Sequence, residues 1–212
     1  ASANGPLKEV VTGMDALDRP AIDAAMETTD GDPALGRLQH DQRVAREGFT
    51  LAGAGQGRVD FWIDDWSLTQ ESGLYRARIP AKDFSFDFAF SATQAPLLQG
   101  DKGLSRKGPR PQSASYYYSL PQLRTTGTLR LGGKPLAVEG KAWLDHEWSD
   151  ELVHPQAVGW DWIGMNLLDG SALTAFRLRR ADGGVLWAGG SLRRPGSAVR
   201  AFANDEVRFS AG

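Results

Sequence analysis

The residues best suited to chemistry gather in one short stretch, 142 to 170, which reads AWLDHEWSDELVHPQAVGWDWIGMNLLDG. This stretch holds four of the chain's seven Trp and two of its three His. Imidazole is the side chain most easily poised as an acid or base near neutral pH. On the inner face of a barrel, His146 beside Trp148 would be a titratable group in an apolar pocket and could act as an acid or base. The same pair in a packed core would be structural.

The period of a β-strand decides which of these side chains can act together. Alternate residues point to one face, so His146 and Trp148 share a face, whereas Asp145, Glu147 and Ser149 share the other. An Asp-His-Glu run on a regular strand cannot converge on one ion, and a metal site needs further ligands. The other two histidines lie in unrelated contexts, so we expect no metal. A core histidine bonded to a backbone carbonyl remains the alternative to an acid–base histidine.

A second pair of rings follows at Trp160 and Trp162, which share a face because they are two residues apart, while Asp161 points to the other. Two aligned indoles beside glycine would suit a wall for a flat or long apolar ligand, and equally a tightly filled core. In the run of three tyrosines, the Tyr117 side chain points to the face of the strand opposite to that of its two neighbours. On an inner face its hydroxyl would offer a hydrogen bond to a ligand.

Strands must position these side chains, because short alternating or apolar segments with Gly-rich turns run through the chain from about residue 38. The clearest segment is 83 to 92, DFSFDFAFSA, in which every second residue is Phe, so that Phe86 and Phe88 lie on one apolar face. We predict an all-β antiparallel meander that closes into a barrel. Its strands are expected at 39–45, 58–68, 74–80, 83–92, 114–120, 124–131, 136–145, 157–168, 172–180 and 185–192.

Two segments depart from the strand pattern. Residues 1 to 37 contain scattered Asp, Gly and Pro, and only AIDAAME (21 to 27) offers a short amphipathic helix, so we predict an irregular arm. Residues 94 to 112, QAPLLQGDKGLSRKGPRPQ, form a long aperiodic connection of the kind that is either functional or disordered. Lys107 in this connection is a candidate ligand contact, or a charge that keeps the loop solvated.

Composition excludes several classes of function. The 24 Lys and Arg balance the 26 Asp and Glu, so no broad basic surface attracts nucleic acid. Cysteine is absent, which removes disulfides and thiolate nucleophiles. No apolar run approaches the roughly 18 to 20 residues of a spanning helix, and the first residues, ASANGPLKEV, lack the apolar region of a signal peptide. Neither a Gly-x-Ser-x-Gly elbow nor a Walker loop is present.

Five segments together resemble the lipocalin-like family that includes carotenoid 1,2-hydratase (hydroxyneurosporene synthase) and many bacterial predicted secreted hydrolases. They are DFWIDDWSL (60 to 68), LLQGDKGLSRKGP (97 to 109), SASYYYSLP (113 to 121), GKAWLDHEWS (140 to 149) and VGWDWIGMNLLDG (158 to 170). The resemblance implies tandem lipocalin-like β-barrels with a long apolar cavity. We therefore predict an arm (1–37), a first barrel (38–156), and either the start of a second barrel or the closing strands of the first (157–212).

The resemblance also implies a mechanism, since the hydratases of this family add water to a terminal isoprenoid double bond without a cofactor, through a tertiary carbocation. It assigns the acid or base to His146 and cation stabilisation to Trp148, with Asp145 or Asp161 as an orienting carboxylate. Further ligand contacts are then expected from aromatic residues and one lysine. These are Trp160, Trp162, Tyr117, Phe86, Phe88 and Lys107.

The function hypothesis is a lipocalin-like protein that binds a hydrophobic, isoprenoid or lipid-like small molecule and hydrates an alkene without a cofactor. A non-catalytic periplasmic lipid carrier and a polyene cyclase are the alternatives. We expect no nucleic-acid partner. Peripheral association with a membrane is left open, and the resemblance implies a periplasmic or secreted location. The oligomeric state stays open.

Overall fold

The computed structural model describes residues 41–43, 45, 51–55, 59–150 and 154–210. All regular structure in these residues is antiparallel β-strand, as predicted. Neither of the two sheets closes into a barrel within the described residues. No helix in the described part of the chain has the length and apolar character to cross a membrane. The predicted arm and its short helix fall outside these residues, as does much of the expected strand at 39–45.

The chain divides into two compact units, which we call the N-terminal unit and the C-terminal unit. The N-terminal unit comprises Gln39–Ala95 and Gln122–Ala142. Within the described residues, the C-terminal unit comprises 96–121, 143–150 and 154–210. Two long strands, β8 (Ala114–Leu131) and β9 (Lys134–Trp148), contribute residues to both units. Each unit is described below by itself.

The N-terminal unit is a meander of short strands that ends on β8. Its sheet order is β1-β2-β3-β4-β5-β8. The short strands are β1 (Ala52–Ala54), β2 (Asp60–Ile63), β3 (Trp66–Glu71), β4 (Leu74–Pro80) and β5 (Phe84–Ser91). The phenylalanines of β5 share one face, as predicted, and the rings of Phe86 and Phe88 stack with their centroids 4.6 Å apart. Phe88 lies opposite Gly127 of β8, which leaves room for the ring.

The single strand predicted at 58–68 is instead a hairpin made of β2 and β3. Ile63 pairs with Trp66, so only Asp64 and Asp65 form the turn. Asp64 adopts a left-handed backbone with a φ of 56°. Asp tolerates this conformation because its short side chain can bond nearby backbone groups. The sequence lacks the glycine that usually marks such a turn, which is why the prediction missed it.

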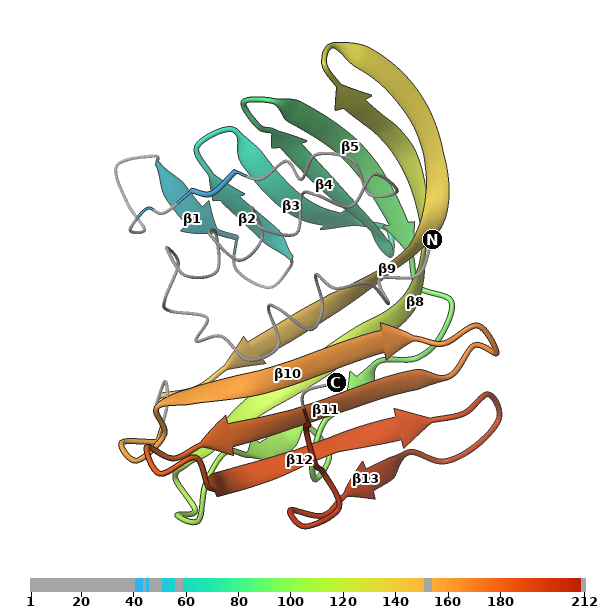
Figure 1. Ribbon diagram of the computed structural model, residues 1–212. Helices are drawn as coiled ribbons and strands as arrows, with labels where there is room; N and C mark the ends of the chain where they lie inside the picture. The colour runs from blue at the N-terminus through green and yellow to red at the C-terminus, as the bar shows by residue number, and fades with distance from the viewer. Residues whose placement is uncertain (1–40, 44, 46–50, 56–58, 151–153, 211–212) are drawn as a thin grey trace. The chain divides into compact units, whose positions relative to one another are not determined.

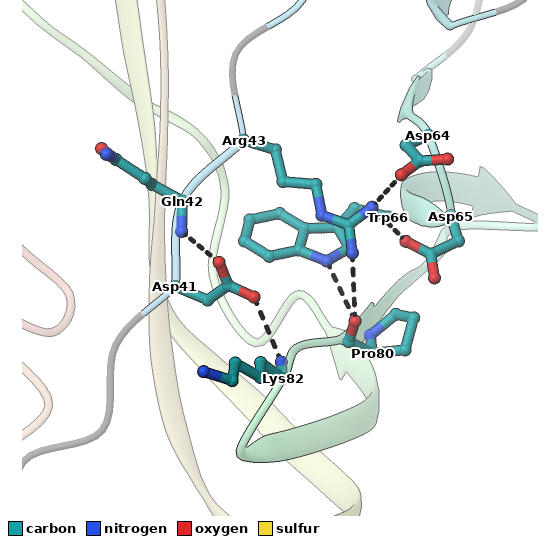
Figure 2. Close-up of polar contacts among 8 residues, drawn as sticks. All are labelled: Asp41, Gln42, Arg43, Asp64, Asp65, Trp66, Pro80 and Lys82. Carbon is teal, nitrogen blue, oxygen red and sulfur yellow. Dashed lines mark hydrogen bonds and ion pairs between the residues drawn. The ribbon is translucent and has the colours of Figure 1, made fainter.

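Arg43 holds the chain before β1 against the β2–β3 turn (Figure 2). Its guanidinium pairs with Asp64 and, at 2.6 Å, with Asp65. It also lies 5.1 Å from the ring of Trp66, whose indole N–H donates to the Pro80 carbonyl at 3.3 Å. Two carboxylates and an aromatic face around one Arg form a local clamp, which contributes to the order of this end of the sheet.

The C-terminal unit contains a four-stranded sheet of order β10-β11-β12-β13, drawn in orange and red in Figure 1. Its strands are β10 (Gly159–Asn166), β11 (Ala172–Arg179), β12 (Val185–Arg193) and β13 (Arg200–Phe202). The unit also contains β6 (Leu97–Leu98) and β7 (Leu104–Arg106), which pair with the first half of β8. Most of the predicted connection 94–112 therefore runs along β8.

A buried polar network joins the β8 layer of the C-terminal unit to its four-stranded sheet. The side-chain amide of Gln99 donates through Nε2 to the Ser119 hydroxyl at 3.0 Å. Its Oε1 accepts from the hydroxyls of Thr174 of β11 at 3.1 Å and Ser191 of β12 at 2.9 Å. All four side chains are buried, and each bond satisfies a group that water cannot reach. The interior of this unit is therefore more polar than the apolar interior that the sequence suggested.

Candidate functional site

Strands β8 and β9 carry the central side chains of the candidate site, and the alternation of these strands divides those side chains between two faces. One face presents Tyr117 together with Asp145 and Glu147. The other presents Tyr118 and His146, whose rings stack. We call the first group, with Lys107, Trp162 and Phe176, the lysine–tyrosine cluster. All six of its members belong to the C-terminal unit.

Lys107 is the cation of this cluster. Its Nζ lies 2.9 Å from Glu147 Oε1, 4.2 Å from the centroid of the Phe176 ring and 4.8 Å from that of Tyr117. The Ser115 hydroxyl donates to the same Glu147 oxygen. Burial lowers the pKa of Lys107, while the charges of Glu147 and Asp145 act in the opposite direction. The Glu147 carboxylate thus stabilises the ammonium form of Lys107, whereas burial favours its neutral amine form.

Asp145 is the hydrogen-bonded acid of the cluster. Its Oδ1 accepts from the Ser119 hydroxyl at 2.6 Å and from the Trp143 indole at 2.9 Å, and Tyr117 also bonds this carboxylate. Although the residue as a whole is exposed, burial of the carboxylate raises the pKa of Asp145, and the three hydrogen bonds oppose that rise. A carboxyl group with a raised pKa keeps its proton at a higher pH than usual and can serve as an acid.

Tyr117 lies at the centre of the cluster, with only 3% of its surface exposed. Its hydroxyl accepts from the Trp162 indole N–H at 3.1 Å. Burial, with the nearby charge of Asp145, raises the pKa of Tyr117, so the phenol stays protonated. The Trp162 side chain remains 39% exposed and pairs across strands with Phe176. Tyr117 therefore bonds the acid and, with Phe176, lies beside the amine, while Trp162 bonds Tyr117 and stays open to solvent.

Four rings form a second group on the opposite face of β8 and β9, which we call the aromatic cluster. Tyr116 stacks on Trp148 with ring centroids 5.5 Å apart, and Tyr118 stacks on His146 at 5.3 Å. His146 also meets Trp148 edge-on at 5.1 Å. Tyr116 and Trp148 are 56% and 51% exposed. The structure brings His146 and Trp148 together on one face and places Asp145 on the other, both as the strand period predicted.

Asp161 joins neither cluster. It lies on the face of β10 opposite to Trp160 and Trp162, with its side chain 1% exposed, and pairs with Arg177 and, at 3.5 Å, with Arg179. Arg177 in turn donates to the Phe209 carbonyl at 3.2 Å. This carboxylate thus neutralises two arginines on the far side of the sheet. Its predicted role as an orienting carboxylate stays a prediction.

The remaining predicted ligand contacts are distributed over both units. Trp160 lies on the same face of β10 as Trp162, opposite Leu178 of β11. Phe86 and Phe88 belong to the N-terminal unit. Phe86 lines a groove of about 340 Å³ there. The other walls of this groove are mainly polar: Arg78, Pro80, Ser85, Asp87, Thr128 and Arg130.

Two members of the lysine–tyrosine cluster had no role in the sequence analysis. Glu147 was placed on the Asp145 face but not connected to Lys107, because nothing in the sequence shows where an aperiodic connection returns. Phe176 could have been found from the Asp169-Gly170 turn, which sets the register that pairs it with Trp162. The structure places Lys107 against Glu147 and two rings, while its predicted contact with a ligand stays a prediction.

Comparison with known proteins finds a matching family and similar solved structures. The AttH-like family model matches residues 22–212. A crystal structure of a candidate AttH from Nitrosomonas europaea is 48% identical with a TM-score of 0.77, over 82% of this chain and 55% of that chain. Kievitone hydratase from Nectria haematococca is 18% identical with a TM-score of 0.56, over 68% of this chain and 45% of that one. None of the curated proteins compared with the chain matches it.

These matches bear on the predictions at different levels. The chain spans about half the length of the solved structures that it matches. Similarity to both confirms the all-β, lipocalin-like fold class, and the second similarity, at 18% identity, concerns the fold alone. The carotenoid hydratase branch that the sequence suggested remains a prediction. The chain belongs to the AttH-like family.

Proposed function

We propose that the lysine–tyrosine cluster binds an unsaturated hydrophobic molecule, isoprenoid or lipid-like, and adds water to its double bond. The observation that carries this proposal is the Asp145 carboxyl, whose pKa is raised by burial and which three donors hold in place, two of them the aromatic side chains of Trp143 and Tyr117. A positioned acid of this kind is what protonation of an alkene requires. The similarity in fold to a hydratase supports the same reaction class.

The proposed reaction follows from the positions of the groups. The acid form of Asp145 gives its proton to one alkene carbon, a C–H bond forms, and the neighbouring carbon becomes a cation. The faces of Trp162 and Phe176 stabilise that cation. Water then adds through its oxygen, and its released proton passes to the Asp145 carboxylate directly or by way of Glu147. The net result is addition of H and OH, with the acid regenerated and no cofactor involved.

Lys107 sets the pH dependence of this reaction. Its ammonium lies over the ring of Phe176, where it would repel a carbocation, so the neutral amine favours the reaction. The rate requires a protonated Asp145 and a neutral Lys107. We therefore expect a bell-shaped pH profile, with its maximum between the raised pKa of Asp145 and the lowered pKa of Lys107. A profile that rises or falls monotonically across this interval would contradict these assignments.

A variant pair tests which face carries the chemistry. With an isoprenoid alkene as substrate and the alcohol measured by gas chromatography and mass spectrometry, we expect Asp145→Asn to reduce turnover by about 100-fold or more. His146→Ala and the exposed control Asp150→Asn should leave turnover nearly unchanged. The opposite result, with loss only in His146→Ala, would move the reaction to the aromatic cluster that the family resemblance favours.

A non-catalytic carrier is the second candidate, and the position of Lys107 favours it. An ammonium that already covers two rings suits a bound carboxylate or carbonyl better than a carbocation. If wild-type protein binds an apolar fluorescent probe but no variant or condition yields the alcohol, the carrier function stands. Loss of probe binding in Trp162→Ala would then place the ligand at the same cluster.

A further inference from the structure

We propose that Lys107 is a carbonyl-binding amine, and that its Nζ forms a reversible imine with an apolar aldehyde or ketone. This activity uses the same cluster as the proposed hydration but needs neither an alkene nor the acid form of Asp145. It therefore goes beyond water addition and can hold even if no hydration occurs. The ligand class is a hydrophobic molecule with one reactive carbonyl group.

The geometry supplies the parts that imine formation requires. A nucleophilic amine must meet the carbonyl carbon, and an acid must protonate the oxygen that leaves. Lys107 Nζ lies 2.9 Å from Glu147 Oε1, within reach for proton transfer. The Phe176 and Tyr117 rings lie on the apolar side of the amine, where the hydrocarbon part of a ligand would pack.

The backbone of the connection holds Lys107 in this position. Its own N–H donates to the Ser113 carbonyl at 2.7 Å. The neighbouring Arg106 donates to the carbonyls of Gly108 and Pro109, each at 3.0 Å, and its guanidinium lies 5.3 Å from the Trp187 ring. The amine is therefore presented from an ordered segment, which reduces the entropy lost when a ligand reacts.

The charges around the amine are compatible with a reactive, neutral form. The titratable groups that face it are Glu147 and Asp145 from β9 and Tyr117 from β8, while β10 and β11 contribute the rings of Trp162 and Phe176. Burial lowers the pKa of Lys107 despite the two carboxylates. The Lys107 side chain is still 21% exposed and that of Glu147 is 40% exposed, so a small carbonyl compound can reach the amine.

The reaction balances without an oxidant or a reductant. The nitrogen lone pair forms a C–N bond as the carbonyl π bond opens, and one N–H proton moves to the oxygen to give a carbinolamine. Glu147, in its acid form, protonates that hydroxyl, which leaves as water while the nitrogen forms the C=N bond. The iminium then returns a proton to Glu147. One amine and one carbonyl thus become one imine and one water.

The test traps the imine by reduction. The folded protein is incubated at pH 7 with citral, a hydrophobic aldehyde, and sodium cyanoborohydride, which converts an imine to a stable secondary amine. Peptide mass mapping then compares Lys107 with Lys102, an exposed lysine in the same connection. We expect Lys107 to be modified at least about tenfold faster, because a positioned acid contributes this factor or more. Equal labelling of the two lysines, or labelling of Lys102 alone, would overturn the proposal.

Four variants complete the experiment. Lys107→Arg keeps the positive charge and should abolish the labelling of this position only, whereas Lys102→Arg should leave labelling of Lys107 unchanged. Glu147→Gln removes the acid and should slow labelling of Lys107 relative to Lys102 in the same sample. Asp145→Asn separates the two functions, since it should stop hydration but not imine trapping. Labelling of Lys107 that is insensitive to Glu147→Gln contradicts the assigned acid.

Discussion

At the scale of single residues, the acidic groups of the C-terminal unit differ in what surrounds them. Asp145 is held by neutral donors from Ser119, Trp143 and Tyr117, and burial raises its pKa. Asp161 is more deeply buried and pairs with two arginines instead of neutral donors. The first arrangement suits proton donation. The second suits stability, because a buried charge persists only when it is paired and hydrogen-bonded.

Removal of the Asp161 charge tests its structural role. In Asp161→Asn, Arg177 and Arg179 lose the charge that compensates them, and we expect the free energy of unfolding to fall by about 3 kcal/mol, near the lower end for a broken buried pair because both arginines are partly exposed. Urea denaturation followed by tryptophan fluorescence measures the change. Asp205→Asn, at an exposed position in the turn before Val207, serves as the control and should behave like wild type.

Activity separates this role from a catalytic one. If the predicted orienting function of Asp161 were correct, Asp161→Asn would reduce turnover while the protein remained folded. We expect instead that turnover per folded molecule is unchanged. A loss of turnover at unchanged stability would restore Asp161 to the reactive site.

At the scale of elements, β11 and β12 approach each other closely because residue 190 of β12 is glycine. Gly190 has a φ of 144°, and a Cβ built on it would lie 2.2 Å from the Thr174 carbonyl oxygen and 2.7 Å from the Ala175 Cα, both on β11. Backbone atoms cannot yield as a flexible side chain does. The register of β11 and β12 therefore excludes any larger residue here.

We expect Gly190→Ala to lower the free energy of unfolding by about 2–4 kcal/mol, through backbone strain together with the collision against β11. Gly196 provides a matched control, because it also has a positive φ, 71°, but no atom lies within 4 Å of a built Cβ. Gly196→Ala should therefore lose only about 1 kcal/mol, the strain alone. Thermal denaturation of both variants measures the difference, and equal losses would show that the collision is relieved.

The elements also show how far the sequence could predict the fold and the site. The strands 74–80 and 83–92 were placed within a residue because Phe and hairpin residues mark them clearly. The segments 114–120 and 124–131 are one strand, since Gln122 takes a left-handed backbone that carries the strand past Pro121. Alternation correctly separated Asp145 from His146. It could not show that Lys107 returns to Glu147, because that contact depends on how the connection folds along β8.

At the scale of the whole molecule, deep burial is unevenly distributed among the described residues. Most apolar side chains with little exposure belong to the C-terminal unit, including Leu97, Leu120, Ala172, Leu178 and Ala188. In the N-terminal unit, the phenylalanines of β5 are only half-buried. Local stability follows burial of this kind, so the two units are expected to open with different free energies.

Hydrogen exchange with mass spectrometry tests this expectation on the intact chain. We expect the amides of β11 and β12 to exchange more slowly than those of β2 and β3, because the former lie in the better buried sheet. Arg43→Ala should accelerate exchange in β2 and β3 by removing the clamp of Figure 2 and should leave β11 unaffected. Equal protection of all four strands would mean that the chain opens as one cooperative body.

The alternation of β9 has a consequence for how such a protein can diversify. Asp145 and His146 are neighbours in sequence yet serve opposite faces, so point substitutions can alter one chemistry while the other is inherited intact. Deletion of a single residue before them would exchange the two faces, so that the imidazole would point to the side of Tyr117 and the Asp145 carboxylate to the side of Tyr118. Relatives of this chain are therefore expected to tolerate changes of residue type in this strand far better than changes in its length.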